Sequence, residues 1–226
     1  MTVRKHVLVL LVVLAALLGS ASASASTPPP VRAEAVLVAD GRTGEILYEE
    51  NADRRIAMAS ITKLMTALVT LEHARPGRIV TVAPQAVGRG GSSIFLSPGE
   101  RLSVRELLAA ALIQSANDSA FALAAAVGDG SVRRFVAMMN AKAVELGLAG
   151  THYVRPDGLD VPRHYSTARD TFTLARLAMR RPLVRRLVRK RTAVIRPNRN
   201  LKNWNDLLWT FPGLVGVKTG HTDRAG

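Results

Sequence analysis

Residues 103–127 read SVRELLAAALIQSANDSAFALAAAV, an apolar stretch with one polar break near its centre. Ser103 followed three residues later by Glu106 is a capping-box pattern, which is typical of a helix start. The apolar signal runs to Ile113, stops over residues 114–118 and resumes to Val127. We therefore predict two consecutive helices joined by a short polar loop.

Further helices are predicted on both sides of this stretch, because apolar residues recur at helical spacing. These segments are 59–73, 131–146, 168–181 and a short basic helix that starts at Pro182. Pro76 and Gly77 follow the first segment, Gly147 closes the second, and Thr167 is placed to cap the third. The middle of the chain is therefore expected to be a helical block.

Strands are predicted before and after this block. Residues 35–40 and 45–49 are rich in Val, Ile and Leu, and a glycine-containing turn over 41–44 joins them into a hairpin. Residues 192–195 and 215–219 also read as strands. Strands first, helices next and strands last indicate an α+β fold, in which the helical block is inserted between parts of one antiparallel sheet.

The composition excludes several classes of function. The 226 residues include no cysteine, which excludes disulfides, cysteine nucleophiles and cysteine-ligated zinc. Five histidines without metal-ligand spacing predict no metal site, and we expect no cofactor. The net charge is +14, yet only 4% of residues are aromatic, too few for a base-stacking nucleic-acid surface. Nucleic acid is therefore not expected as a partner, which leaves an anionic wall polymer or a membrane surface as the polyanion to consider.

The first residues have the pattern of an export signal. Arg4 and Lys5 precede an apolar run over 7–19, and small residues follow over 20–25. This order describes a secretory signal peptide. The run is shorter than the about 20 residues that span a bilayer, and an uncleaved anchor is the alternative. We predict a signal peptide over 1–25, a Ser/Pro linker over 26–32, one domain over 33–226, and an exported, extracytoplasmic protein.

The first chemical motif is SITK at residues 60–63. Its spacing places Ser60 and Lys63 on one helix face, and the helix start leaves free backbone N–H groups beside the serine. A serine hydroxyl becomes a nucleophile when a base takes its proton. A lysine is such a base when burial or a nearby positive charge lowers its pKa. The alternative is an N-cap serine followed by a solvated lysine.

Two further motifs follow along the chain. Ser115 and Asn117 lie at the polar break, where a hydroxyl and an amide are suited to relay a proton and hold a peptide; the alternative is a solvent-facing loop. The sequence KTG at 218–220 ends the last predicted strand, where its glycine leaves room for a substrate backbone. Lys218 is also suited to lower the pKa of Lys63 by repulsion. The alternative is a strand-end lysine beside a turn.

Together, in this order, the three motifs are the signature of penicillin-binding proteins and class A β-lactamases. The chain resembles the serine D-alanyl-D-alanine carboxypeptidases, the low-molecular-weight penicillin-binding proteins, from about Ala35 to its last residue. The stretches that carry the resemblance are ADGRTGEILY (39–48), ASITKLMTA (59–67), GGSSIFL (90–96), LIQSAND (112–118), YSTARD (165–170) and GVKTGHTD (216–223). The resemblance implies a β-lactamase/transpeptidase-like fold.

The resemblance also implies an activity, namely hydrolysis of the terminal D-Ala from D-Ala-D-Ala peptidoglycan stem peptides in cell-wall maturation. Ser60 is then the acylated nucleophile, Lys63 its general base, and Ser115 the proton relay. Asn117 holds the substrate amide, and Lys218 and Thr219 bind near the substrate carboxylate. The backbone N–H groups of Ser60 and His221 form the oxyanion hole. β-Lactams are expected to acylate Ser60 as poorly released mimics.

The sequence departs from the family pattern in two places. Arg155 stands where the family often has Asn, which affects the local loop. The chain also stops at Gly226, whereas the family continues into two more strands and a helix. We expect the last sheet strands to be missing, Lys218 to lie on an unpaired strand edge, and this C-terminally truncated form to be unstable or weakly active.

Two rival functions remain open. A class A β-lactamase uses a Glu for deacylation, and the only Glu between Ser115 and Lys218 is Glu145, inside a predicted helix. A non-catalytic wall-binding protein would use the basic stretch over 180–191, which otherwise reads as a solvated helix face. The remaining histidines, His73, His152 and His164, are expected to be structural or on the surface. Trp204 and Trp209 are expected to serve packing.

Overall fold

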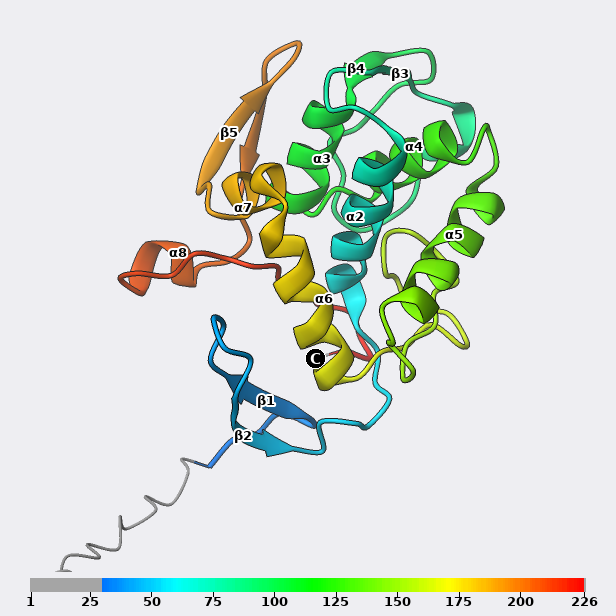
Figure 1. Ribbon diagram of the computed structural model, residues 1–226. Coiled ribbons are helices and arrows are strands. Elements are labelled where there is room, and N and C mark those ends of the chain that lie inside the picture. Colours follow the sequence, from blue (N-terminus) through cyan, green and yellow to red (C-terminus); the bar gives the residue numbers. More distant parts are fainter. Residues whose placement is uncertain (1–29, 226) are drawn as a thin grey trace, which may run out of the picture. The chain divides into compact units, whose positions relative to one another are not determined.

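A computed structural model describes residues 30–225, and its helices and strands carry the labels of Figure 1. The chain divides into two units, Met1–Ala33 and Glu34–Gly226, and the helices and strands of the described residues lie in the second. The predicted signal peptide and most of the predicted linker lie outside the described residues.

The two helices predicted around the polar break are present as α3 (Val104–Ile113) and α4 (Asn117–Val127). A capping box starts α3: the Ser103 hydroxyl accepts a hydrogen bond from the Glu106 N–H, and the Glu106 carboxylate accepts one from the Ser103 N–H. The side chains of α4 are buried on nearly every face. An apolar sequence on all sides of a helix suits this position inside the helical block.

The other predicted helices also form. They are α2 (Lys63–His73), α5 (Val132–Glu145), α6 (Ala168–Arg180) and the short basic α7 (Pro182–Val188). Three shorter elements are η1 (Ala59–Thr62), η2 (Pro84–Ala86) and α8 (Leu207–Thr210). The Thr167 hydroxyl accepts a hydrogen bond from the Asp170 N–H and so caps α6, as expected.

The core surrounds α2, which contacts α4, α5 and α6 (Figure 1). All residues from Lys63 to Thr70 of this helix are buried. Large side chains that contribute to the core include Leu64, Leu107, Leu123, Phe135 and Met139. The residue at the start of α2 is therefore held inside the buried core of the protein.

The strands form three antiparallel pairs among the described residues, and not one sheet. These pairs are β1 (Val36–Ala39) with β2 (Ile46–Glu50), β3 (Ile79–Thr81) with β4 (Arg101–Ser103), and β5 (Thr192–Ile195) with β6 (Arg199–Lys202). The first pair is the predicted hairpin. The α+β composition holds, because the helical block separates β1 and β2 from β5 and β6.

The prediction of a strand over 215–219 is wrong for this structure. A strand is defined by its ladder partner, and no described segment forms a ladder with these residues. Three strands, β3, β4 and β6, were not predicted. The first two have three residues each, which are too few to establish an alternating pattern, and β6 contains a single apolar residue, Leu201. Among residues 30–225, none of the helices has both the length and the apolar character needed to cross a bilayer.

Candidate active site

The first motif is placed at the junction of η1 and α2, in the core. Ser60 lies in η1 and Lys63 is the first residue of α2. The Lys63 ammonium donates a hydrogen bond to the Ser60 hydroxyl at 2.8 Å. Ala59, directly before the serine, has a positive φ of 45°, a backbone conformation that only surrounding structure can hold in a residue with a side chain. The turn thus presents a half-buried hydroxyl beside a buried amine.

Lys63 is completely buried, and three acceptors surround its amine. These are the Ser60 hydroxyl, the Asn117 side-chain oxygen at 2.7 Å and the Asp157 backbone carbonyl at 2.7 Å. Desolvation and then repulsion by Lys218 lower the pKa of Lys63 to about 7. The expected effect of Lys218 is confirmed. Near neutral pH a substantial fraction of Lys63 is therefore a neutral amine, which is able to accept a proton from Ser60.

The second motif lies in the loop between α3 and α4, and not in open solvent. Ser115 is buried and has a positive φ of 63°. Asn117 is buried as well, and its amide is held from two sides: its oxygen accepts from Lys63, and its nitrogen donates to the Gly90 carbonyl at 2.7 Å. The alternative of a solvent-facing loop is therefore wrong.

The third motif forms an extended segment that packs against the nucleophile. The Lys218 ammonium donates to the Thr219 carbonyl at 2.8 Å, and desolvation lowers the pKa of Lys218 to about 7. A Cβ at Gly220 would lie 3.0 Å from the Met58 carbonyl oxygen and 3.3 Å from the Ser60 backbone nitrogen. A glycine here allows the two backbones to approach. The segment after Lys218 is thus beside Ser60 even without a ladder.

One pocket of about 410 Å³ joins the three motifs. The residues that line it are Ser60, Gly91, Ser92, Ser115, Asn117, Leu159, Trp204, Thr219, Gly220 and His221. Lys63 and Lys218 lie behind this lining, where each is hydrogen-bonded to a residue of the lining. All predicted site residues therefore converge on one place, although residues 60 and 221 are far apart in the chain.

Asp118 shapes one wall of this pocket, a role that sequence reasoning missed. Its buried carboxylate accepts hydrogen bonds from the Ser93 hydroxyl at 2.6 Å and from the backbone N–H groups of Ile94 and Leu96. These contacts fold the loop over 90–96 against the start of α4. The sequence signal was an acidic residue in the first turn of a helix. Acidic residues are common at this position because they interact favourably with the helix dipole, so the signal did not point to a role in the pocket.

Trp204 is the second missed residue, because it was expected to serve packing. Its side chain is 58% exposed and lines the pocket. The indole N–H donates to the Gln114 carbonyl at 2.8 Å, which also accepts from the Ser92 hydroxyl at 2.6 Å. The carbonyl next to Ser115 thus fixes the orientation of the ring. Trp209, by contrast, lies near Arg191 and Lys202 and is not part of the pocket lining.

Ion pairs hold the β5–β6 hairpin, which leads into Trp204. Arg196 binds the Glu106 carboxylate with two nitrogens at 2.8 and 2.9 Å, and Arg199 binds the Glu100 carboxylate. The Arg196 guanidinium holds the pKa of Glu106 far below its usual range, and Arg199 lowers that of Glu100. Glu106 thus serves both the capping box of α3 and the attachment of the hairpin.

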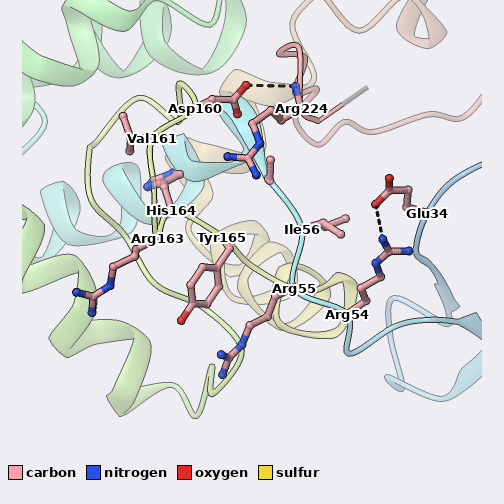
Figure 2. A pocket seen from close by; sticks show the side chains of 11 residues that line it. Glu34, Arg54, Arg55, Ile56, Asp160, Val161, Arg163, His164, Tyr165 and Arg224 are labelled. Atoms are coloured by element: carbon pink, nitrogen blue, oxygen red, sulfur yellow. Dashed lines mark hydrogen bonds and ion pairs between the residues drawn. The ribbon is translucent and has the colours of Figure 1, made fainter.

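A second pocket of about 450 Å³ has Asp160, His164 and Arg224 in its lining (Figure 2). The Asp160 carboxylate accepts from the Thr222 hydroxyl and the Arg224 N–H, so it fixes the segment that follows the third motif. At its inner wall, His164 accepts from the Val154 N–H through Nδ1, so that Nε2 donates to the Thr62 hydroxyl. Desolvation lowers the pKa of His164 to about 4, which keeps the ring neutral. This confirms that His164 is structural.

Among residues 30–225, no group of three or more His, Cys, Asp or Glu side chains is arranged to hold a metal ion.

The chain matches, over residues 22–226, the family model described as D-alanyl-D-alanine carboxypeptidase. It is 37% identical to the carboxypeptidase DacF of Bacillus subtilis (85% of this chain, 52% of that protein) and 35% identical to DacA of Escherichia coli (88% and 52%). The chain thus spans about half the length of these curated relatives.

Solved structures are similar as well. A D-alanyl-D-alanine carboxypeptidase from Mycobacterium tuberculosis superposes with a TM-score of 0.83 at 32% identity, covering 89% of this chain and 78% of that one. A Streptomyces DD-transpeptidase superposes with a TM-score of 0.80 at 33% identity, covering 88% and 83%. These likenesses confirm the predicted α+β fold of the penicillin-binding type.

The close approach of Gly158 to η1 generates a stability prediction. Gly158 has φ +95°, and a Cβ there would collide with the Ala59 carbonyl; Gly147 has φ +70° with open space around it. We expect Gly147→Ala to cost about 1–2 kcal/mol through its backbone conformation alone, and Gly158→Ala to cost about 1–3 kcal/mol more through overpacking. Urea unfolding of both variants measures the difference. Equal losses would show that the loop is free to move away from η1.

Proposed function

The chain belongs to peptidase family S11, the D-alanyl-D-alanine carboxypeptidases, and on that basis we propose that it removes the terminal D-Ala from D-Ala-D-Ala stem peptides of peptidoglycan through a Ser60 acyl-enzyme. The observation that carries this proposal is the contact between Lys63 Nζ and Ser60 Oγ at 2.8 Å, with the pKa of the lysine lowered to about 7. A general base with a pKa near the working pH is the most effective one.

In the proposed acylation, neutral Lys63 takes the proton of the Ser60 hydroxyl as the oxygen attacks the carbonyl carbon of the penultimate D-Ala. The new C–O bond replaces the C–N bond to the terminal D-Ala, whose amine leaves with a proton returned through Lys63 and Ser115. Water then attacks the ester, which releases the shortened peptide and restores the Ser60 hydroxyl. The three contacts of Lys63 support its role as the proton carrier. When the neutral amine donates its two N–H groups to the Asn117 side-chain oxygen and the Asp157 carbonyl, its lone pair is directed at the Ser60 hydroxyl.

The remaining groups bind the substrate in this proposal. The backbone N–H groups of Ser60 and His221 stabilise the oxyanion, and the closeness of Gly220 to the Ser60 nitrogen supports that pairing. Asn117 holds the peptide amide, and Lys218 and Thr219 receive the terminal carboxylate. A lysine with a lowered pKa becomes fully charged when an anion binds beside it.

A β-lactamase function finds no support in the pocket. Glu145 lies at the end of α5, where it is exposed and binds Lys142 at 2.6 Å. The described residues that line the pocket include no carboxylate. The carboxylate base that class A enzymes use for deacylation therefore has no counterpart in the described pocket lining, which favours slow release of a β-lactam.

The nucleophile is tested by intact mass spectrometry after incubation with a penicillin. We expect one adduct per chain in the wild type and none in Ser60→Ala, because no other hydroxyl among residues 30–225 is bonded to Lys63. Ser97→Ala, which removes an exposed serine outside the pocket lining, serves as the control and should keep the adduct. An adduct that persists in Ser60→Ala would reject Ser60 as the nucleophile.

Trp204 is tested as a determinant of substrate preference. The exposed indole offers an apolar wall to a substituent of the acyl group, so Trp204→Ala should slow acylation by benzylpenicillin about three- to tenfold. Acylation by 6-aminopenicillanic acid, which lacks the aryl group, should stay within about twofold. Trp209→Ala is the matched control, because that indole lies outside the pocket. Equal slowing with both compounds would assign Trp204 to the shape of the loop.

We further propose that the protein is exported and extracytoplasmic, with residues 1–25 as the signal peptide, since stem peptides are cross-linked outside the cytoplasm. Contact with an anionic wall polymer or a membrane surface is proposed through the basic stretch. In α7 the side chains of Val184, Leu187 and Val188 are buried while Arg185 and Arg186 are exposed. This amphipathic pattern leaves the positive face available to a polyanion.

The polyanion contact is tested by retention on isolated cell walls at increasing salt. Replacing Arg185, Arg186 and Arg189 by Gln should lower the salt concentration at which the protein is released, because fewer counterions are exchanged. Replacing the exposed Arg101, Arg105 and Arg133 by Gln removes the same charge elsewhere and should have a smaller effect. Retention that does not depend on salt would reject the proposal.

A further inference from the structure

We propose that Arg155 is a positioning residue for the catalytic lysine: it neutralises the buried Asp157 carboxylate, so that this loop offers Lys63 a carbonyl acceptor without an adjacent net negative charge. The inference rests on the proposed function, because it concerns the base that activates Ser60. Arg155 is also the residue that departs from the family pattern, a departure expected from the sequence to affect the local loop alone.

The ion pair is buried and bidentate. The Asp157 side chain is completely buried, and its two oxygens accept from Arg155 Nε at 2.5 Å and from an Arg155 terminal nitrogen at 2.8 Å. The arginine side chain is only 22% exposed. A buried carboxylate without such a partner would be strongly unfavourable. The residue that contributes a carbonyl to the site therefore depends on Arg155 for its charge balance.

The loop that carries this pair is attached directly to the helix of the nucleophile. The Asp157 carbonyl accepts from Lys63 Nζ at 2.7 Å, and the Pro156 carbonyl accepts from the Thr66 hydroxyl at 2.6 Å. Gly158 packs on the Ala59 carbonyl. Because backbone contacts hold the loop at these three points, the Asp157 carboxylate stays close to Lys63 whatever its own charge state.

The ring of Phe121 also contacts the Arg155 guanidinium. The Arg155 guanidinium lies 5.7 Å from the centre of the Phe121 ring, and the Arg89 guanidinium lies 4.4 Å from the same centre. Cations prefer the face of an aromatic ring. Arg89 thus lies over the same ring as Arg155. Of these two arginines, Arg155 alone binds the Asp157 carboxylate, so Arg89 is a matched control.

The charges that face Lys63 come from three parts of the protein. Lys218 in the extended segment and Arg155 in the loop lower its pKa, whereas Asp157 in the loop and Asp118 in α4 raise it. Neutral His164 also lies near Asp157. The Asp118 carboxylate is stabilised by four donors, the Ser93 hydroxyl and three backbone N–H groups. Loss of the Arg155 charge would leave Asp157 to stabilise the ammonium form of Lys63, which cannot accept the proton of Ser60.

The experiment measures the second-order rate constant of acylation by a penicillin between about pH 5 and pH 9. In the wild type we expect the acid limb near pH 7, the pKa of Lys63. Arg155→Gln should move this limb up by about one pH unit or more, a tenfold loss of rate per unit on the limb. Asp157→Asn should move it down, and the double variant should return it toward the wild type. Arg89→Gln should leave it in place.

A second readout separates this inference from the proposed function. The Cε chemical shift of ¹³C-labelled Lys63, assigned by its loss in Lys63→Met, reports protonation whether or not the protein reacts. Opposite shifts of this titration in Arg155→Gln and Asp157→Asn support the inference, even where no penicillin adduct forms and the proposed function fails. An unchanged titration in both variants overturns it. Acylation slowed equally at all pH values in a folded Arg155→Gln variant overturns it as well.

Discussion

The arrangement of the site depends on one buried amine. Lys63 lies at the start of α2, completely buried, with hydrogen bonds to η1, to the start of α4 and to the loop over 155–158. The last two bonds tie segments distant in sequence to the same nitrogen atom. Burial without these acceptors would be prohibitive for a polar group. The segments that form the pocket are therefore held together by the group whose protonation they adjust.

The helical block could be predicted from local sequence, because its signals are local. A capping box at Ser103 and Glu106, a glycine after α5 and apolar spacing along α2 each specify an element without reference to the rest of the chain. The extended segment at 215–219 could not be read correctly in this way. Its apolar residues suit a strand, but a strand also requires a partner at ladder distance, and the pairing is a property of distant residues.

The same distinction applies to the site. Motifs with a known chemistry, together with the family resemblance, are what predict the site residues Ser60, Lys63, Ser115, Asn117, Lys218, Thr219 and His221. Asp157 and Trp204 were missed because they contribute through the fold: one offers a backbone carbonyl, which every residue possesses, and the other an aromatic face oriented by the Gln114 carbonyl. The Arg155–Asp157 pair was visible as two charges two residues apart, but the complete burial of the Asp157 carboxylate was not.

The attachment of the β5–β6 hairpin has a consequence for how the pocket responds to its surroundings. The pKa values of Glu106 and Glu100 are lowered by their arginine partners, so both carboxylates stay ionised, and both ion pairs persist, at a pH below the usual pKa of a glutamate. Dissolved ions act differently, because they weaken partly exposed pairs at any pH. The ion pairs that hold the β5–β6 hairpin should therefore persist at low pH and weaken at high ionic strength. The position of Trp204, and with it the substituents that the pocket accepts, should then depend on the salt concentration.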